Sequence, residues 1–227
     1  MKTLLLSSIL LALACAAGAD APKTPEDVPL GVNLLRNSGV EAEAPALPPA
    51  GKKVFWNRER TGGGYFPNWP PDFTYHEREG SGAVELVDDV SLEGRRSVRL
   101  TCALFGNNGF YFVQNVNVPA RGGDVFHAAV YVRCEVEATM YRSLALQYRM
   151  ASGKNEQANV TAPRLPEGDS PWKRIELTSV APAGAVGVAA VSFKVSNTPM
   201  HGRVWWDSLT LVKLAAAPPP ETPAEAR

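Results

Sequence analysis

The stretch Phe126-His-Ala-Ala-Val-Tyr-Val-Arg-Cys-Glu-Val136 shows the pattern on which the fold prediction rests. Every second residue from Phe126 is apolar or small. The residues between them include His127, Tyr131, Arg133 and Glu135. Successive side chains of a β-strand point to opposite faces, so this order predicts a strand with one face in a core and the other toward solvent.

Shorter runs of the same kind lie on both sides of this stretch, and turn residues separate them. The predicted strands cover residues 83–87, 98–104, 110–118, 126–136, 141–148, 172–180, 186–195 and 204–212. Turn chemistry is plain at Gly106-Asn-Asn-Gly109 and at Pro182-Ala-Gly184. No window keeps a helical period with caps. The chain is therefore predicted to be all-β, a two-sheet antiparallel β-sandwich of the jelly-roll type.

The two ends of the chain differ in composition from the part between them. Residues 1–19 have the positive start, short apolar run and small-residue cleavage site of a signal peptide, which predicts a secreted or periplasmic protein. Lipid attachment at Cys15 is the alternative. Residues 20–32, rich in proline and charge, are predicted to be a flexible leader. Residues 33–213 are predicted to form the sandwich, and residues 214–227, rich in alanine and proline, to be a disordered tail.

Charge and cysteine content narrow the function classes. The chain has 23 Lys and Arg against 23 Asp and Glu, and this balance argues against nucleic acid or an anionic membrane as the main partner. Cys102 and Cys134 both fall on the apolar side of predicted strands. They either pair as a disulfide in an oxidising compartment or are simply small buried residues.

Asn33-Leu-Leu-Arg-Asn-Ser-Gly-Val-Glu41 resembles the opening strand of CenC-type carbohydrate-binding modules. Three later stretches follow in that family's order, at residues 92–100, 112–118 and 204–211, so the resemblance covers nearly all of residues 33–213. It implies a galactose-binding-like jelly roll that binds a glycan without chemistry. Val40 departs from the family's usual Phe, and residues 61–71 form a Gly- and Pro-rich insertion.

The resemblance also implies a structural calcium ion. In modules of this type such an ion often ties the first strand to the last, and Glu41 and Asp207 stand at the matching positions. The turn at residues 91–94 is expected to add carbonyl oxygens, since calcium prefers six to eight oxygen ligands. The alternative is that Glu41 caps a turn and Asp207 bonds backbone amides at a bulge.

Glycans are bound by flat aromatic rings and by planar polar side chains that bond hydroxyl groups in pairs. The outward-facing residues with that character lie on two consecutive predicted strands, which are expected to share one sheet face. Gln114 would extend the row, and the insertion would add a loop wall. The candidate residues are Tyr131, Arg133, Tyr141, Gln147, Gln114 and Trp69. The alternative for each aromatic residue is ordinary packing.

No constellation in the sequence points to catalysis. His76, His127 and His201 lack metal-ligand spacing, and no nucleophile or phosphate-binding motif is present. The sequence therefore predicts a non-enzymatic, secreted carbohydrate-binding module whose partner is a polysaccharide or cell-envelope glycan. The alternative is a structural or adhesion module that uses the same fold to contact a cell-surface protein.

Overall fold

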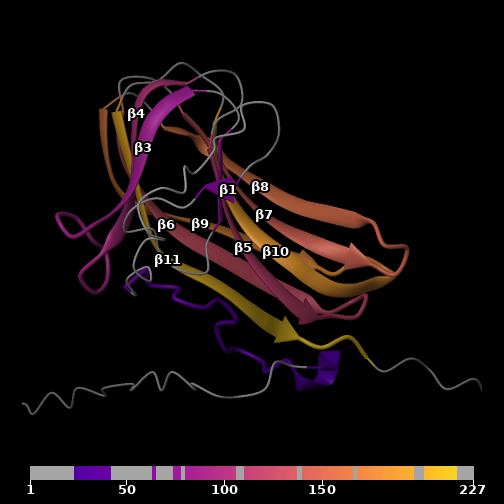
Figure 1. Ribbon diagram of the computed structural model, residues 1–227. Helices are drawn as coiled ribbons and strands as arrows, with labels where there is room; N and C mark the ends of the chain where they lie inside the picture. Colours follow the sequence, from indigo (N-terminus) through magenta and orange to yellow (C-terminus); the bar gives the residue numbers. More distant parts are fainter. Residues whose placement is uncertain are drawn as a thin grey trace, which may run out of the picture.

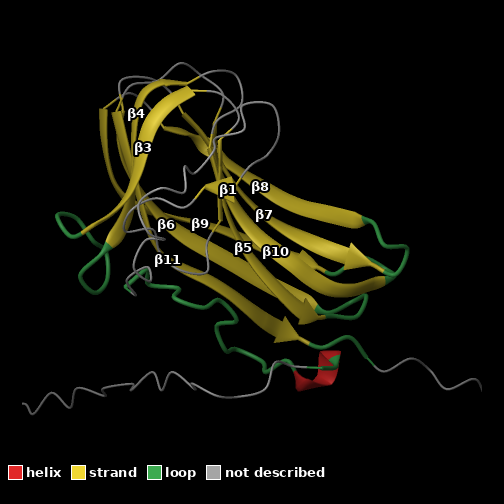
Figure 2. Cartoon of the chain, in the orientation of Figure 1, coloured by secondary structure: helices red, strands yellow, loops and turns green. Residues whose placement is uncertain are grey.

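The computed structural model describes residues 23–41, 63–64, 74–77, 80–105, 110–136, 140–165, 168–196 and 202–218, which form two stacked antiparallel β-sheets (Figure 1). Within these ranges the only helical element is one short turn, and strands make up most of the rest (Figure 2). In chain order the elements are η1 (Pro25–Asp27), β1 (Gly63–Gly64), β2 (Thr74–Glu77), β3 (Gly80–Val87), β4 (Ser97–Phe105), β5 (Phe110–Pro119), β6 (Val125–Val136), β7 (Met140–Met150), β8 (Asn155–Leu165), β9 (Gly168–Val180), β10 (Ala185–Ser196) and β11 (Gly202–Ala215).

The strand order defines a jelly roll. Sheet A has five strands in the order β3-β4-β11-β6-β9, and sheet B has six in the order β1-β2-β5-β10-β7-β8. Setting aside β3 and the β1–β2 pair at the edges leaves β4-β11-β6-β9 facing β5-β10-β7-β8. This is the arrangement of two interlocked Greek keys. The predicted fold class, an antiparallel two-sheet sandwich, is confirmed.

The predicted strands are all present, with longer ends than the sequence suggested. Strand β8 was not predicted, because its first residues, Asn155-Glu-Gln-Ala-Asn159, show no apolar alternation. It forms because it pairs with β7 at the edge of sheet B, where an edge strand does not need a continuous apolar face. The short strands β1 and β2 were also missed.

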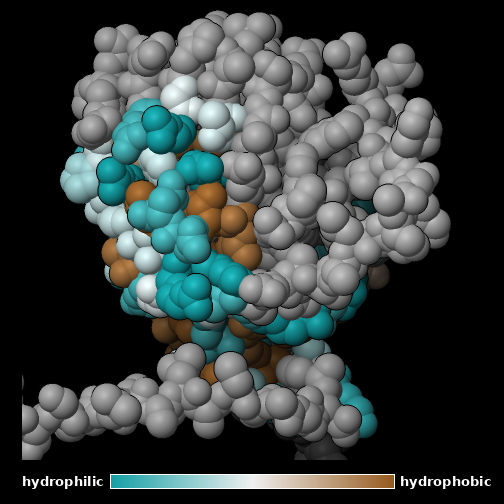
Figure 3. Space-filling model, turned by 60° about the vertical axis from the view of Figure 1, so that its left-hand side comes forward, coloured by the Kyte–Doolittle hydropathy of each residue, from teal (hydrophilic) through white to brown (hydrophobic). Residues whose placement is uncertain are grey.

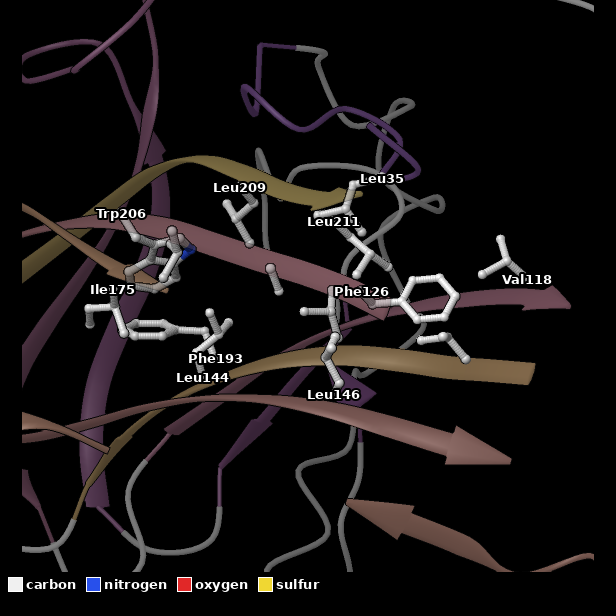
Figure 4. Close-up of a cluster of buried hydrophobic side chains, with 14 of the residues drawn as sticks. Leu35, Val118, Phe126, Leu144, Leu146, Ile175, Phe193, Trp206, Leu209 and Leu211 are labelled. Carbon is white, nitrogen blue, oxygen red and sulfur yellow. The ribbon is translucent and has the colours of Figure 1, made fainter. Parts of the chain in front are cut away.

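The core lies between the two sheets and is filled by the inward positions of their strands (Figure 4). On β6 the alternation read from the sequence holds on the inward face, where Phe126, Val130 and Cys134 are all fully buried. From sheet B, Phe193 meets Trp206 of β11 with ring centroids 6.1 Å apart. Burial of such side chains contributes roughly 1.5–3 kcal/mol each. Cys134 is fully buried, but the side chain of Cys102 lies outside the description, so the disulfide and the two small buried residues stay alternatives.

Residues 33–41, called here the opening segment, take up the position beside β11 that β4 leaves free beyond Trp206. The side-chain amide of Asn33 replaces part of a strand's backbone: it donates to the Leu209 carbonyl (3.1 Å) and accepts from the Leu211 amide (3.0 Å). On the other side, Gln114 of β5 accepts from the Arg36 amide and donates to the Arg36 carbonyl, both at 2.9 Å. The opening segment is therefore bonded to both sheets.

Two segments expected to be flexible are packed against the sandwich. Of the predicted leader, residues 23–32 are described, and Val28 is buried within them. Of the predicted tail, Ala217 is buried. Composition did not reveal their anchor, a buried ion pair, and the flexibility of the two segments stays a prediction. The predicted signal peptide and residues 219–227 lie outside the described residues.

That anchor is Lys213 of β11, whose ammonium group lies 3.0 Å from a carboxylate oxygen of Asp124. Lys213 also donates to the Pro25 carbonyl at 2.7 Å, and Asp124 accepts from the Ala217 amide at 2.7 Å. One fully buried pair thus binds the segments before and after the sandwich. Burial pushes the pKa of Asp124 upward, but the amides of Ala217 and Arg121 and the Lys213 ammonium outweigh it, so the pKa lies below its ordinary value.

Asp124→Asn is expected to destabilise the domain by about 3–5 kcal/mol at pH 7, because Lys213 would keep a buried charge without its counter-ion. Urea unfolding measures the difference. The folded-state pKa of Asp124 is lowered. Its contribution to the free energy of unfolding is therefore fully present above the pKa range of ordinary carboxyl groups, and it is lost as pH falls through the folded-state pKa. The gap between wild type and variant should therefore narrow in acid.

Glu26→Gln is the matched control, because Glu26 is exposed and pairs with Arg121 at the surface. Its expected cost is within about 1 kcal/mol. Equal stability of Asp124→Asn and wild type at pH 7, or a gap that does not change with pH, would contradict this account of the anchor.

Candidate functional site

Asp207 lies at an irregularity in β11, where the register to β6 shifts between Asp207 and Thr210 and Ser208 adopts a positive φ of 49°. This bulge turns the carboxylate toward the loop between β3 and β4. Its Oδ2 accepts from the amides of Leu92 (2.8 Å) and Glu93 (3.2 Å), and its Oδ1 accepts from the Ser208 amide (2.6 Å). Asp207 is fully buried.

Glu41, at the end of the opening segment, binds the next part of the same loop. Its Oε1 accepts from the amides of Arg95 (2.8 Å) and Arg96 (3.0 Å). The carboxylate lies directly over Gly94, which has a φ of +63° and where any Cβ would collide with Glu41 Oε1. The predicted metal ligands Glu41 and Asp207 are therefore brought to one turn, residues 91–96.

This turn presents amide hydrogens to the two carboxylates, as the alternative interpretation of the sequence expected. Even so, burial raises the pKa of Asp207 above its ordinary value, and the negative charge of Glu41 acts in the same direction. Among the described residues no group of three or more His, Cys, Asp or Glu is placed to hold a metal ion. A calcium ion here would use the remaining lone pairs of Glu41 and Asp207 together with backbone oxygens.

The predicted sugar-binding residues do not share a face. Tyr131 and Arg133 lie on β6 in sheet A, whereas Gln147 lies on β7 in sheet B. Their neighbours Val130, Val132, Leu146 and Tyr148 are buried between the sheets, so these three side chains point away from the core on opposite sides of the sandwich. The expectation of one shared face was wrong because the chain crosses from sheet A to sheet B between β6 and β7.

Gln114 is not a surface residue. Only 1% of it is exposed, because its partner in β10 is the core residue Val191 and its amide holds the Arg36 peptide. Its predicted role in sugar binding is therefore contradicted. Tyr141 is placed on β7, paired with Ser196, but its side chain lies outside the description, as does the whole of Trp69.

The outer face of sheet A is occupied by its own ion pairs. Trp205 of β11 is almost completely buried there, with the guanidinium of Arg133 5.4 Å and that of Arg203 6.0 Å from its ring centroid. Glu135 pairs with both arginines, at 3.0 and 3.8 Å. Seen from the side of the β3–β4 hairpin, the described surface carries a hydrophilic band beside apolar patches (Figure 3). Arg133, Arg203 and Glu135 on the outer face of sheet A thus already have partners.

The outer face of sheet B carries a line of side-chain amides instead of ion pairs. The register places Asn115 of β5, Ala190 of β10, Gln147 of β7 and Gln157 of β8 in one line across four neighbouring strands. Asn115 and Gln157 are exposed and Gln147 is half-buried. Asn115, Gln147 and Gln157 are called here the amide row. No hydrogen bond joins these three side chains to the described part of the protein.

Small residues lie at the centre of this face. Ala190 lies between Asn115 and Gln147, and Ser192 and Ala145 occupy the adjacent line on β10 and β7, between Val113 of β5 and Asn159 of β8. The side-chain amides of the row therefore project beyond the shorter side chains at the centre of the face. Of the row, the sequence predicted Gln147 alone. Asn115 and Gln157 were missed because their alignment depends on the unpredicted strand β8 and on a register irregularity between β5 and β10.

No family model and no curated relative matches the chain. Similar solved structures include a Clostridium thermocellum xylanase 10B fragment with CBM22-1 and GH10 modules bound to xylohexaose (TM-score 0.47, 16% identity, 63% of this chain and 26% of that chain). The CBM22-1 xylan-binding domain of Paenibacillus barcinonensis Xyn10C has a TM-score of 0.45 at 14% identity, covering 64% and 87%.

Tailspike protein 4 of bacteriophage CBA120 has a TM-score of 0.46 at 17% identity, and the match spans 63% of this chain but only 19% of the tailspike chain. These structures are similar to the chain at the level of a β-sandwich, and several are carbohydrate-binding modules by name. The specific resemblance to CenC-type modules stays a prediction.

Gly94→Ala tests the turn that Glu41 and Asp207 hold. The added Cβ would displace the Glu41 carboxylate and strain a left-handed residue, so we expect a loss of more than about 2 kcal/mol in stability. Gly153→Ala is the matched control, with a φ of +79° but nothing within 4 Å of the added Cβ, and should cost about 1 kcal/mol by strain alone. Equal losses in urea unfolding would show that Glu41 does not hold the turn.

Proposed function

We propose that this chain is a non-catalytic glycan-binding module that binds an oligosaccharide across the outer face of sheet B. The observation that carries the proposal is the amide row, in which Asn115, Gln147 and Gln157 lie on one line with no described protein partner. We further propose, from its predicted signal peptide, that the module acts outside the cytoplasm. Among the described residues, no helix is long and apolar enough to cross a membrane.

The chemistry of the row suits sugar hydroxyls. A primary amide has two donor hydrogens and one carbonyl acceptor in a single plane, and neighbouring hydroxyl groups of a sugar both donate and accept. One amide can therefore bond two adjacent hydroxyls. Neighbouring strands lie about 4.8 Å apart, so the row from Asn115 to Gln157 is about 14 Å long. That length exceeds a single pyranose ring, and the expected ligand is an oligomer.

The small residues beneath the row let a sugar ring approach the sheet. Ala190 stands between Asn115 and Gln147, and Ala145 and Ser192 continue the low surface along the strands. Larger side chains at these positions would hold a ring away from the amides. Tyr141 and Trp69 stay predicted contacts, because an aromatic ring near this face would supply the stacking surface that sugars favour.

One observation favours the alternative, contact with another protein. Leu30 and Leu214 are 57% and 49% exposed, and Leu30 bridges to Lys213, so these two large apolar side chains lie close together beside the end of β11. Exposed apolar groups of this kind suit a protein partner better than a sugar. This surface is separate from the amide row, and Leu30→Ser with Leu214→Ser would weaken protein contact but leave glycan binding unchanged.

We also propose a structural calcium ion between Glu41 and Asp207. The support is geometric: both carboxylates lie on the turn at residues 91–96, one of them fully buried, with their charges close enough to oppose each other. A divalent cation would offset this repulsion and join the opening segment to β11.

The glycan proposal is tested by calorimetry with soluble oligosaccharides of xylan, mannan, cellulose, β-glucan, peptidoglycan, oligogalacturonate and oligomannuronate. Asn115→Ala and Gln157→Ala are each expected to weaken binding about fivefold, the effect of losing roughly 1 kcal/mol of hydrogen bonding. Arg133→Gln on the opposite sheet is the control and should leave affinity unchanged. If no oligosaccharide of the panel bound, the proposal would be rejected. A loss of affinity confined to Arg133→Gln would place the site on sheet A.

The calcium proposal is tested by melting. Chelation with EGTA is expected to lower the melting temperature of the wild type, since a ligand present at a hundred times its Kd stabilises by about 2.7 kcal/mol. Glu41→Gln keeps an oxygen for the Arg95 and Arg96 amides while removing the charge, so its melting temperature should not respond to the chelator. A wild-type melt that is the same with and without EGTA would rule out the ion.

A further inference from the structure

Arg149 of β7 lies across Gly187 of the neighbouring strand β10, on the outer face of sheet B. The two residues are register partners, and a Cβ at Gly187 would meet the Arg149 guanidinium at 3.0 Å and the Val118 carbonyl at 2.9 Å. The absence of a side chain at Gly187 is therefore what lets the guanidinium lie over β10. Arg149 is exposed, and no ion pair joins it to a described carboxylate.

This guanidinium adjoins the amide row. Gln147 and Arg149 occupy successive outward positions of β7, and their partners in β10 are Ala190 and Gly187. Residues two apart on a strand are separated by about 7 Å. A sugar whose hydroxyls meet the side-chain amides of the row thus has its periphery within reach of Arg149.

The paired strands around the amide row present no outward carboxylate among their described residues. Along the lines that join β5, β10, β7 and β8 from Lys194 to Gly187, no outward position is Asp or Glu. Arg149 is the cationic residue that lies beside the amide row on these lines. On sheet A, by contrast, Glu135 and Glu176 each pair with outward arginines.

We propose that the glycan bound here is acidic, and that one of its carboxylates pairs with Arg149. This inference rests on the proposed function and specifies its substrate class as a polymer containing uronic acids. A guanidinium offers parallel N–H groups that match the two oxygens of a carboxylate. Because Gly187 lets Arg149 lie against the sheet, that fork is held near the amides that bond the hydroxyls.

The test compares trigalacturonate with its fully methyl-esterified form, and trimannuronate with mannotriose, by calorimetry on the full chain at low and high salt. At least one acid should bind about tenfold more tightly than its neutral counterpart, and added salt should reduce the difference. Arg149→Gln should abolish this preference while leaving the weaker neutral binding in place. Arg174→Gln on sheet A is the control and should keep the preference.

Gly187→Ala gives a second variant that retains the arginine. Its Cβ would displace the guanidinium, so the preference for the acid should fall although the net charge is unchanged. Because the same Cβ would also meet the Val118 carbonyl of β5 at 2.9 Å, unchanged binding of the neutral form and the melting temperature together check that the amide row is intact. Equal binding of acidic and neutral forms, or a preference that survives in Arg149→Gln, would overturn the inference and leave the proposed function standing. Failure of every glycan, acidic or neutral, would overturn the proposed function as well.

Discussion

The opening segment, residues 33–41, is bonded to both sheets at once, and the rest of the structure depends on this. The side-chain amide of Asn33 forms hydrogen bonds with the backbone of β11. Gln114 of β5 accepts from the Arg36 amide, and Glu41 accepts from the Arg95 amide in the turn before β4. Without these bonds, β11 beyond Trp206 would lack a partner on one side. A buried polar group with its partner removed is costly, so each bond constrains the path of the chain.

The partners of the outward side chains explain why the candidate site lies on sheet B. On the outer face of sheet A, arginines and glutamates pair with one another over Trp205. On sheet B the central strands bring small residues to the surface, and β5 and β8 place amides on either side of them. Groups that the protein leaves without partners are available to a ligand, whereas paired groups must first be separated from each other.

The sequence was sufficient for the fold and only partly sufficient for the site. Strict alternation in residues 126–136 predicted a half-buried strand, and the structure confirms it at Phe126, Val130 and Cys134. Gln114 was misplaced because a polar residue on the inward side of a strand looks like a surface residue until its partner, Arg36, is known. Tyr131 and Gln147 were grouped because sequence order does not reveal that β6 and β7 belong to different sheets. Asn115 and Gln157 could not be found, because residues 42 positions apart are brought into one line only through the pairing of β5, β10, β7 and β8.

The central claim is that the amide row binds the glycan, and the most direct measurement is chemical-shift mapping by NMR during titration with a glycan that binds. The side-chain NH₂ signals of Asn115, Gln147 and Gln157 are expected to shift together, with backbone shifts confined to the outward positions of β5, β10, β7 and β8. Shifts that gather instead around Tyr131 and Arg133 on β6, with the three side-chain amides unmoved, would contradict the account.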